Sequence, residues 1–380
     1  MSENSEINYD GKEKGDSLSK LLMKKSHKTQ DEIMSEYTYY DENGSRLISL
    51  LYDLNSLEVE LHDVITKNVF RGIDYYKLVS IAPTWVRDAG HSQEASMTKA
   101  RFESLLEYNN NPITHKFLYY HDCEMLMSAF QNRTHAIEHM MNSIFKHLSP
   151  ELRSIKEYEE VVFSSCRADI DLHVFLNSLI ITLASSFDLI TKVAHELLHM
   201  HEVSFEGYPK MKSAKVTYGD RVRLSENLKV EQTLFAENEP IYVRQIMSLR
   251  DEIIHNGSLD FRYSSYHGII DGKIDDFLFF PEMTESGVLL SHKARRKFYS
   301  DYTRTFNVIL PQLVCDVLEC LRHTLRMLID KFDCPWHENP DEPLNYEDEI
   351  SKWSGLILDG DPNKIEWFLD KLNQVKKNLL

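Results

Sequence analysis

An arginine and a histidine lie five residues apart near the middle of the chain, where a predicted helix ends. The segment runs from Arg250 through Asp251 to His255 and is followed by Asn256 and Gly257. An arginine can bind a phosphate as a planar fork that stays charged, and a histidine with a near-neutral pKa can move protons to and from the oxygens of a ribose-phosphate link. These residue types suit cleavage of RNA without a metal ion.

The end of this helix and the spacing of the two residues restrict how they can act. Gly257 after Asn256 is a typical helix stop, so we expect His255 in the last turn, where the negative end of the helix dipole favours imidazolium. Positions i and i+5 are about 140° apart around a helix, so Arg250 and His255 do not share one face. A second surface must therefore complete any site that they form.

The pattern of Arg250, a following polar residue and His255 resembles the motif of HEPN domains, which are helical modules of prokaryotic toxins and phage-defence proteins. The resemblance covers roughly residues 165 to 330 and includes a long preceding helix, expected from Asp171 to Met200. It implies that Arg250 holds the scissile phosphate, that His255 is the general acid and base, and that Asp251 orients or hydrogen-bonds.

The resemblance also implies partners and a biological role. In catalytic HEPN proteins two domains dimerise and form a metal-independent endoribonuclease, so we expect RNA as substrate, a homodimer, no cofactor and no metal. The implied role is a toxin or phage-defence effector of abortive infection, held silent until triggered, with a regulatory protein or antitoxin as a possible partner.

Two alternatives to this activity stay open. A HEPN domain can also be a scaffold or sensor module without catalysis. In addition, arginine and histidine in a final helical turn simply complement the helix dipole. Arg133, His135 and His139 come close to the same pattern without indicating a site, which shows how easily such a short motif arises by chance.

Three polar residues of the preceding helix are candidates to support Arg250 and His255. Asn177, Ser185 and Asp188 would lie close to them if the two helices pack together. Asp188 is the strongest of the three, because a carboxylate can bind either cation. Ordinary exposed side chains on a helix would have the same pattern.

A different chemistry is suggested by His195, Glu196 and His199, which form an H-E-x-x-H pattern. Two histidines four residues apart on one helical face can bind Zn²⁺, and the glutamate can activate a water molecule, as in zinc metalloproteases. No motif singles out a third protein ligand among the downstream glutamates. The segment also fits an ordinary helix that buries one apolar stripe and exposes a polar face.

The charge of the chain limits how it could bind RNA. It carries 60 acidic and 43 basic side chains, for a formal net charge of −17, and such a protein repels phosphate at a distance. A local cluster of cations is therefore required. The candidate RNA-binding cluster, which could equally be a solvated helix start, consists of Lys293, Arg295, Arg296 and Lys297.

Cysteine and hydropathy patterns indicate a cytoplasmic protein without a membrane partner. The five cysteines have no C-x-x-C spacing, which fits reduced thiols better than a disulfide framework or a cysteine zinc site. No run of about 18 apolar residues is evident, and the first residues are acidic, unlike a secretory signal peptide.

These patterns predict a mainly α-helical protein, a HEPN-like bundle with an N-terminal helical region and a small β-hairpin appendage. An Asp-Gly pair between two apolar runs is the signal for the hairpin. The expected organisation is a disordered tail at 1–44, the N-terminal helical region at 45–150, a HEPN-like domain at 151–333 with an insertion at 203–237 and the hairpin at 263–280, and an acidic linker with a helix at 334–380.

Overall fold

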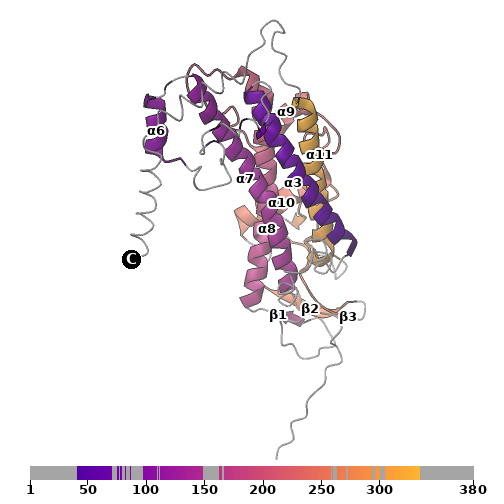
Figure 1. The fold of residues 1–380 in the computed structure, drawn as a ribbon. Coiled ribbons are helices and arrows are strands. Elements are labelled where there is room, and N and C mark those ends of the chain that lie inside the picture. The colour runs from indigo at the N-terminus through magenta and orange to yellow at the C-terminus, as the bar shows by residue number, and fades with distance from the viewer. Residues whose placement is uncertain are drawn as a thin grey trace, which may run out of the picture. The chain divides into compact units, whose positions relative to one another are not determined.

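A computed structural model shows that the chain is mainly α-helical with a small β-hairpin, as the sequence predicts (Figure 1). The predicted tail at 1–44 and the linker and helix at 334–380 lie outside the described residues, except that the first helix begins at Asp41. The structure describes residues 41–70, 75–76, 78, 82, 86, 97–108, 110, 112–148, 162–164, 167–257, 259, 263–270, 273–292, 296–299 and 304–333.

Long helices dominate this part of the chain. The longest of them place leucine, isoleucine, valine or phenylalanine at three- and four-residue steps, so that one stripe of each helix is buried. The helices are α3 (Asp41–Val69), α6 (Lys99–Tyr108), α7 (Pro112–His147), α8 (Arg167–His199), α9 (Arg221–Leu228), α10 (Ile241–Asn256) and α11 (Phe306–Phe332), with short 3-10 turns η4 (Met200–Glu202) and η5 (Tyr218–Asp220).

The chain divides into two compact units, each assembled from separate stretches of sequence. Unit 1 takes Met1–Asn55, Arg133–Phe187 and Lys229–Thr324, and unit 2 takes Ser56–Asn132, Asp188–Leu228 and Leu325–Leu380. Four helices are divided between the units, with one segment in unit 1 and the other in unit 2: α3, α7, α8 and α11. The domain boundary predicted near residue 150 stays a prediction.

The strands of the structure belong to unit 1. Strands β2 (Ser265–Ile270) and β3 (Lys273–Phe277) form an antiparallel hairpin with Ile269 opposite Ile274, which confirms the hairpin predicted at 263–280. The short strand β1 (Val162–Ser164) adds to β2, giving the order β1-β2-β3 (Figure 1). A second antiparallel pair joins two-residue strands, β4 (Ser291–His292) and β5 (Arg296–Lys297).

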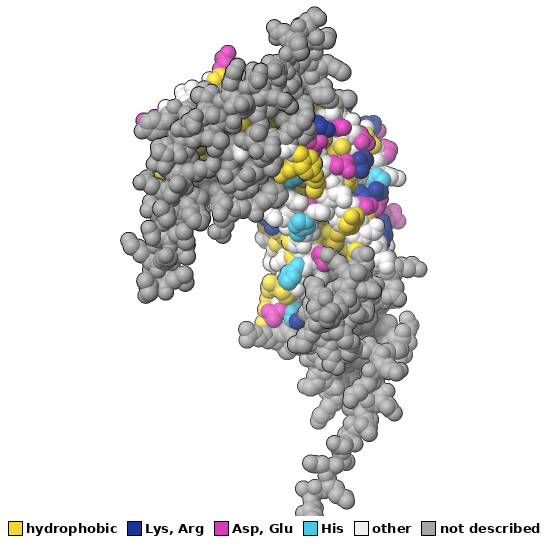
Figure 2. Space-filling view, viewed as in Figure 1, with side chains coloured by type: hydrophobic (Ala, Val, Ile, Leu, Met, Phe, Trp, Pro, Cys, Tyr) yellow, Lys and Arg dark blue, Asp and Glu magenta, His cyan; other side chains and the backbone are white. Residues whose placement is uncertain are grey.

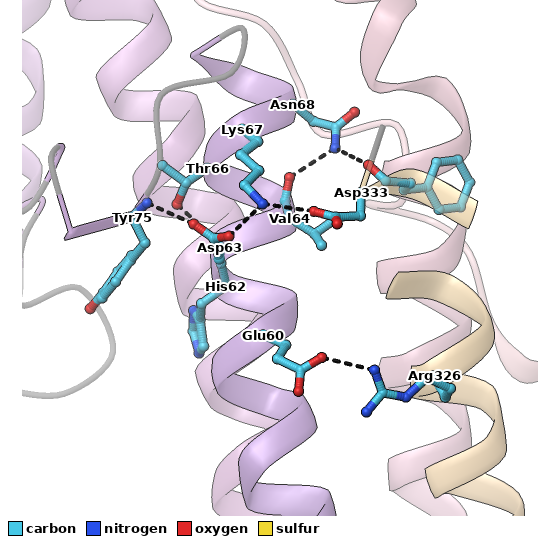
Figure 3. Close-up of polar contacts among 11 residues, drawn as sticks. Glu60, His62, Asp63, Val64, Thr66, Lys67, Asn68, Tyr75, Arg326 and Asp333 are labelled. Atoms are coloured by element: carbon cyan, nitrogen blue, oxygen red, sulfur yellow. Dashed lines mark hydrogen bonds and ion pairs between the residues drawn. The ribbon is translucent and has the colours of Figure 1, made fainter. Parts of the chain in front are cut away.

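In unit 2, polar side chains fasten the last turns of α3 and α11 to each other (Figure 3). The Lys67 ammonium lies 2.7 Å from Oδ1 of Asp333 and 2.8 Å from Oδ2 of Asp63. The Asn68 amide donates to the backbone carbonyls of Val64 and Phe332, both at 2.8 Å. The Phe332 carbonyl lies in the last turn of α11, where carbonyls lack intrahelical partners, so its bond with Asn68 satisfies a group that would otherwise need water.

Helix α8 shows how a core helix can look like a membrane span. A stretch from Asp169 to Glu202 is long and apolar enough to cross a bilayer by length and composition, but 56% of its most apolar window is buried inside the protein. Among the described residues it is the one helix that meets this test. The core helix of a soluble protein meets the same test, so the finding is weak evidence for a membrane.

Candidate functional site

Helix α10, which carries Arg250, Asp251 and His255, is held in unit 1 by one apolar face and by a loop. Val243, Ile246 and Leu249 are fully buried at three-residue spacing. The Ser248 hydroxyl accepts a hydrogen bond of 3.0 Å from the backbone N–H of Leu289. These contacts fix the axis of α10, and with it the direction in which its polar residues project.

The same loop approaches the start of α10 very closely at a glycine. Gly287 has a φ of +82°, and a Cβ added to it would lie 2.8 Å from the carbonyl oxygen of Ile241. Only glycine combines this left-handed backbone conformation with so close an approach. The position therefore specifies how the loop packs against α10.

The C-terminal end of α10 agrees with the sequence prediction. The helix ends at Asn256, and Gly257 follows with a φ of +97°. His255 lies in the last turn with an exposed side chain. A histidine in this place is accessible to a ligand.

Arg250 is paired with its neighbour in the chain. One guanidinium nitrogen of Arg250 donates to the Oδ1 of Asp251 at 2.6 Å, and the side chains are 32% and 54% exposed. An ion pair this open to water is weak and can exchange for a stronger anion. Because a guanidinium has five N–H donors, Arg250 can keep this contact and still bind a phosphate oxygen.

The structure does not bring Arg250 and His255 into contact with each other. Among the described residues no hydrogen bond or ion pair joins them, as their five-residue spacing predicts. Ile254, beside His255, is 49% exposed, so the end of α10 also presents an apolar side chain to its surroundings. A single copy of the helix therefore offers the two cations on separate faces.

Of the three predicted supporting residues, Ser185 and Asp188 have other partners. The Ser185 hydroxyl donates to the carbonyl of Thr182 in its own helix, and Asp188 accepts a hydrogen bond of 2.7 Å from the backbone N–H of Tyr218. Asn177 keeps a buried side-chain oxygen without a hydrogen-bond partner. In the part of the chain that the structure describes, Asp251 is therefore the predicted side chain that contacts Arg250.

Glu196, the central residue of the zinc-like pattern, is a structural anchor in unit 2. Its side chain is 2% exposed and accepts hydrogen bonds from the Tyr119 hydroxyl at 2.5 Å and from the backbone N–H groups of Lys212 at 3.2 Å and Ser213 at 2.7 Å. Both carboxylate oxygens are thus occupied in fixing the segment after α8. A glutamate that activates a metal-bound water must instead face that water.

The two histidines of the pattern lie close together but gather no further ligand. The rings of His195 and His199 have centroids 4.5 Å apart, and His199 Nδ1 lies 3.0 Å from Glu202. Burial, and then the charge of His199, lower the pKa of His195. Over the described stretches, no group of three or more histidine, cysteine or acidic side chains could hold a metal ion. The geometry gives the zinc alternative no support.

The side chains of the predicted RNA-binding cluster, Lys293, Arg295, Arg296 and Lys297, lie outside the described residues, and only the backbone of the last two is described, as β5. Elsewhere on the described surface, the face shown in Figure 2 intersperses acidic, basic, histidine and apolar side chains. That mixture fits the acidic balance of the whole chain.

A partly open cavity of about 230 Å³ lies in unit 1 beside the hairpin. Its one imidazole, His173, is 2% exposed, with Nε2 2.9 Å from the carbonyl oxygen of Ser264. The His173 Nδ1 has no hydrogen-bond partner. The cavity is lined by His173, Leu176, Leu259, Tyr266, Leu278, Phe279, Tyr299 and Phe306.

Sequence reasoning missed this cavity because its walls come from distant parts of the chain. The available signal is the density of aromatic residues in and after the hairpin, where the rings of Tyr266 and Phe279 have centroids 4.6 Å apart. Aromatic residues in a strand usually indicate packing. From the sequence alone, the hairpin is therefore interpreted as an appendage and not as the wall of a cavity.

The chain matches no protein-family model, and neither the curated proteins nor the solved structures give a match. The residues and their geometry therefore carry the functional argument alone.

Proposed function

We propose that this protein is a metal-independent endoribonuclease of the HEPN type that acts as a homodimer. The observation that carries the proposal is the C-terminal end of α10, where Arg250, its partner Asp251 and the exposed His255 lie in the order of the HEPN motif. The scaffold positions these side chains and leaves them accessible to a ligand.

The proposed reaction needs only one positive charge and one group that transfers protons. Neutral His255 takes the proton of a ribose 2′-hydroxyl as that oxygen attacks the adjacent phosphorus. The bond from phosphorus to the 5′-oxygen breaks, and a protonated His255, from the same or the second copy, gives that oxygen its proton. The products are a 2′,3′-cyclic phosphate and a 5′-hydroxyl end. Arg250 stabilises the additional negative charge on the phosphate oxygens.

A second copy of the chain would supply what one helix end lacks. Arg250 and His255 project from different faces of α10, so two helices related by a twofold axis could place one cation from each copy on a common phosphate. The exposed Ile254 between them would be covered in such a pairing. We propose a growth-arresting toxin or phage-defence effector in the cytoplasm as the role of this activity.

The first experiment measures RNA cleavage in excess EDTA by the full chain and by Arg250→Ala and His255→Ala. We expect each substitution to slow cleavage by about 100-fold or more, because His255→Ala removes the general acid and base and Arg250→Ala removes the charge that stabilises the transition state. Arg133→Ala and His135→Ala are matched controls, because these exposed residues of α7 resemble the motif and should leave the rate unchanged.

Two outcomes of this experiment would contradict the proposal. Cleavage that survives both Arg250→Ala and His255→Ala removes the nuclease assignment, and cleavage that stops in EDTA removes the metal-free mechanism. Light scattering gives a second measurement, since a strictly monomeric protein would leave the site incomplete. A dimer with no cleavage of any RNA would instead favour the non-catalytic scaffold, which the net charge of −17 also suits.

A further inference from the structure

The cavity beside the hairpin has walls suited to a flat ring. Four of its lining residues are aromatic, from Tyr266 and Phe279 of the hairpin region to Tyr299 and Phe306, and leucines form the rest of the apolar wall. A cavity of about 150 Å³ lined by apolar side chains is known to accept benzene. One of about 230 Å³ has room for a larger planar molecule of one or two rings.

One lining residue carries a polar atom that has no partner. The Nε2 of His173 lies 2.9 Å from the carbonyl oxygen of Ser264, and the backbone N–H of Ser264 also donates to Nε2 at 3.2 Å. The first contact needs a proton on Nε2 and the second needs none there, so Nδ1 is an acceptor in one tautomer and a donor in the other. Since Nδ1 is buried without a partner, a ligand edge that carries both donors and acceptors can satisfy it in either tautomer. The cavity therefore matches a ring system with an apolar face and an edge of donors and acceptors, which is the chemistry of a nucleobase.

The position of the cavity connects it to α10. Leu259, a lining residue, comes four residues after His255 in the same unit. Four residues of extended chain span at most about 14 Å, so this wall is within a few nucleotide units of the histidine. Tyr299, which is 42% exposed, donates a hydrogen bond of 2.5 Å to the Leu259 carbonyl and ties the accessible side of the cavity to that segment.

We propose that this cavity binds one unstacked base of the RNA strand whose phosphate lies at Arg250 and His255, an inference that rests on the proposed function. The base stacks against the aromatic walls and forms a hydrogen bond with His173 Nδ1. Proteins that read single-stranded RNA commonly stack splayed bases on aromatic rings and hydrogen-bond their edges. The cavity thereby positions the strand beside the reacting phosphate.

The test measures binding and cleavage separately. Saturation-transfer NMR with adenosine, guanosine, cytidine and uridine reports base binding to the full chain without any cleavage, and indole serves as an apolar ring of similar size. Leu176→Phe should fill the cavity, while Val174→Phe adds the same ring on the 50% exposed side of α8 and is its control. If Leu176→Phe does not fold, Tyr299→Ala removes a stacking wall, with the exposed Tyr52→Ala as its control.

We expect at least one nucleoside to bind, and its affinity and the RNA cleavage rate to fall by tenfold or more in the cavity variants but not in the controls. Indole binding without any nucleoside binding would overturn the inference, as would full cleavage by a cavity variant that no longer binds nucleosides. A third outcome separates the two proposals: nucleosides bind, Leu176→Phe abolishes this binding, and the protein cuts no RNA. That result would refute the nuclease and its link to the cavity, but not the binding of a base in the cavity.

Discussion

His62 and Glu124 form a buried ion pair in unit 2, with His62 Nδ1 2.6 Å from Glu124 Oε2. The pair joins α3 to α7, and the two residues are only 4% and 2% exposed. Burial by itself lowers the pKa of His62, but the charge and hydrogen bond of Glu124, together with the charge of Glu58, outweigh it and raise that pKa above its usual value. The surroundings of His62 therefore favour its protonated form relative to a free histidine.

This pair makes the stability of the protein depend on pH. A raised folded-state pKa means that the contribution of His62 to the free energy of unfolding is fully present below its unfolded pKa of about 6.5 and is lost as the pH rises through the folded value. Urea unfolding between pH 5 and pH 9 should show this decline, and His62→Gln should remove that component. His135→Gln, at an exposed position of α7, should keep the wild-type slope. Identical slopes for all three proteins would contradict the assignment.

Replacement of Glu196 by alanine should destabilise the protein. The substitution leaves the Tyr119 hydroxyl and the N–H groups of Lys212 and Ser213 without their acceptor, and we expect a loss of about 3 kcal/mol in chemical unfolding. His199→Ala, at a half-exposed position of the same helix, should cost far less. An unchanged midpoint for Glu196→Ala would mean that these hydrogen bonds do not hold the segment after α8.

Gly287→Ala tests how closely the loop packs on α10. The new Cβ would meet the Ile241 carbonyl at 2.8 Å in a backbone conformation that alanine rarely adopts, so we expect about 2 kcal/mol of destabilisation. Gly207→Ala is the matched control, since a Cβ there has nothing within 4 Å. The melting temperatures of the two variants are compared. Equal values would show that the loop can move away from α10 without loss of stability.

Asp251→Asn separates the chemistry of the proposed site from its stability. The contact with Arg250 is open to water, so the substitution should change the free energy of unfolding by less than about 1 kcal/mol. If Asp251 orients the guanidinium, cleavage should slow by about tenfold. Glu285→Gln, at an exposed position of unit 1, should leave the rate unchanged. A full rate for Asp251→Asn would limit the site to Arg250 and His255.

Local signals in the sequence were enough for the long helices and for the hairpin, but not for the short helix α9, which lies inside the predicted insertion at 203–237. Apolar residues at helical steps identify the buried stripe of α8 from Leu172 to Leu197, and the stop at Gly257 follows from the conformational freedom of glycine. The Asp-Gly pair located the turn between β2 and β3. Each of these features is determined by residues close together in the chain.

Features that depend on distant residues were beyond such reasoning. Asp188 binds the backbone N–H of Tyr218, thirty positions away, and Glu196 binds the segment at Lys212 and Ser213. Nothing in the sequence near these acids indicates their partners. The cavity at His173 is the same case, since its other lining residues run from Leu176 to Phe306.

The Asn68 side chain is hydrogen-bonded to the ends of both α3 and α11. Its single amide group donates to the carbonyl of Val64 in one helix and to that of Phe332 in the other. Fraying of either terminus withdraws a hydrogen-bond partner from the same nitrogen. Loosening of the last turn of either helix therefore removes one of the two hydrogen bonds of this shared side chain.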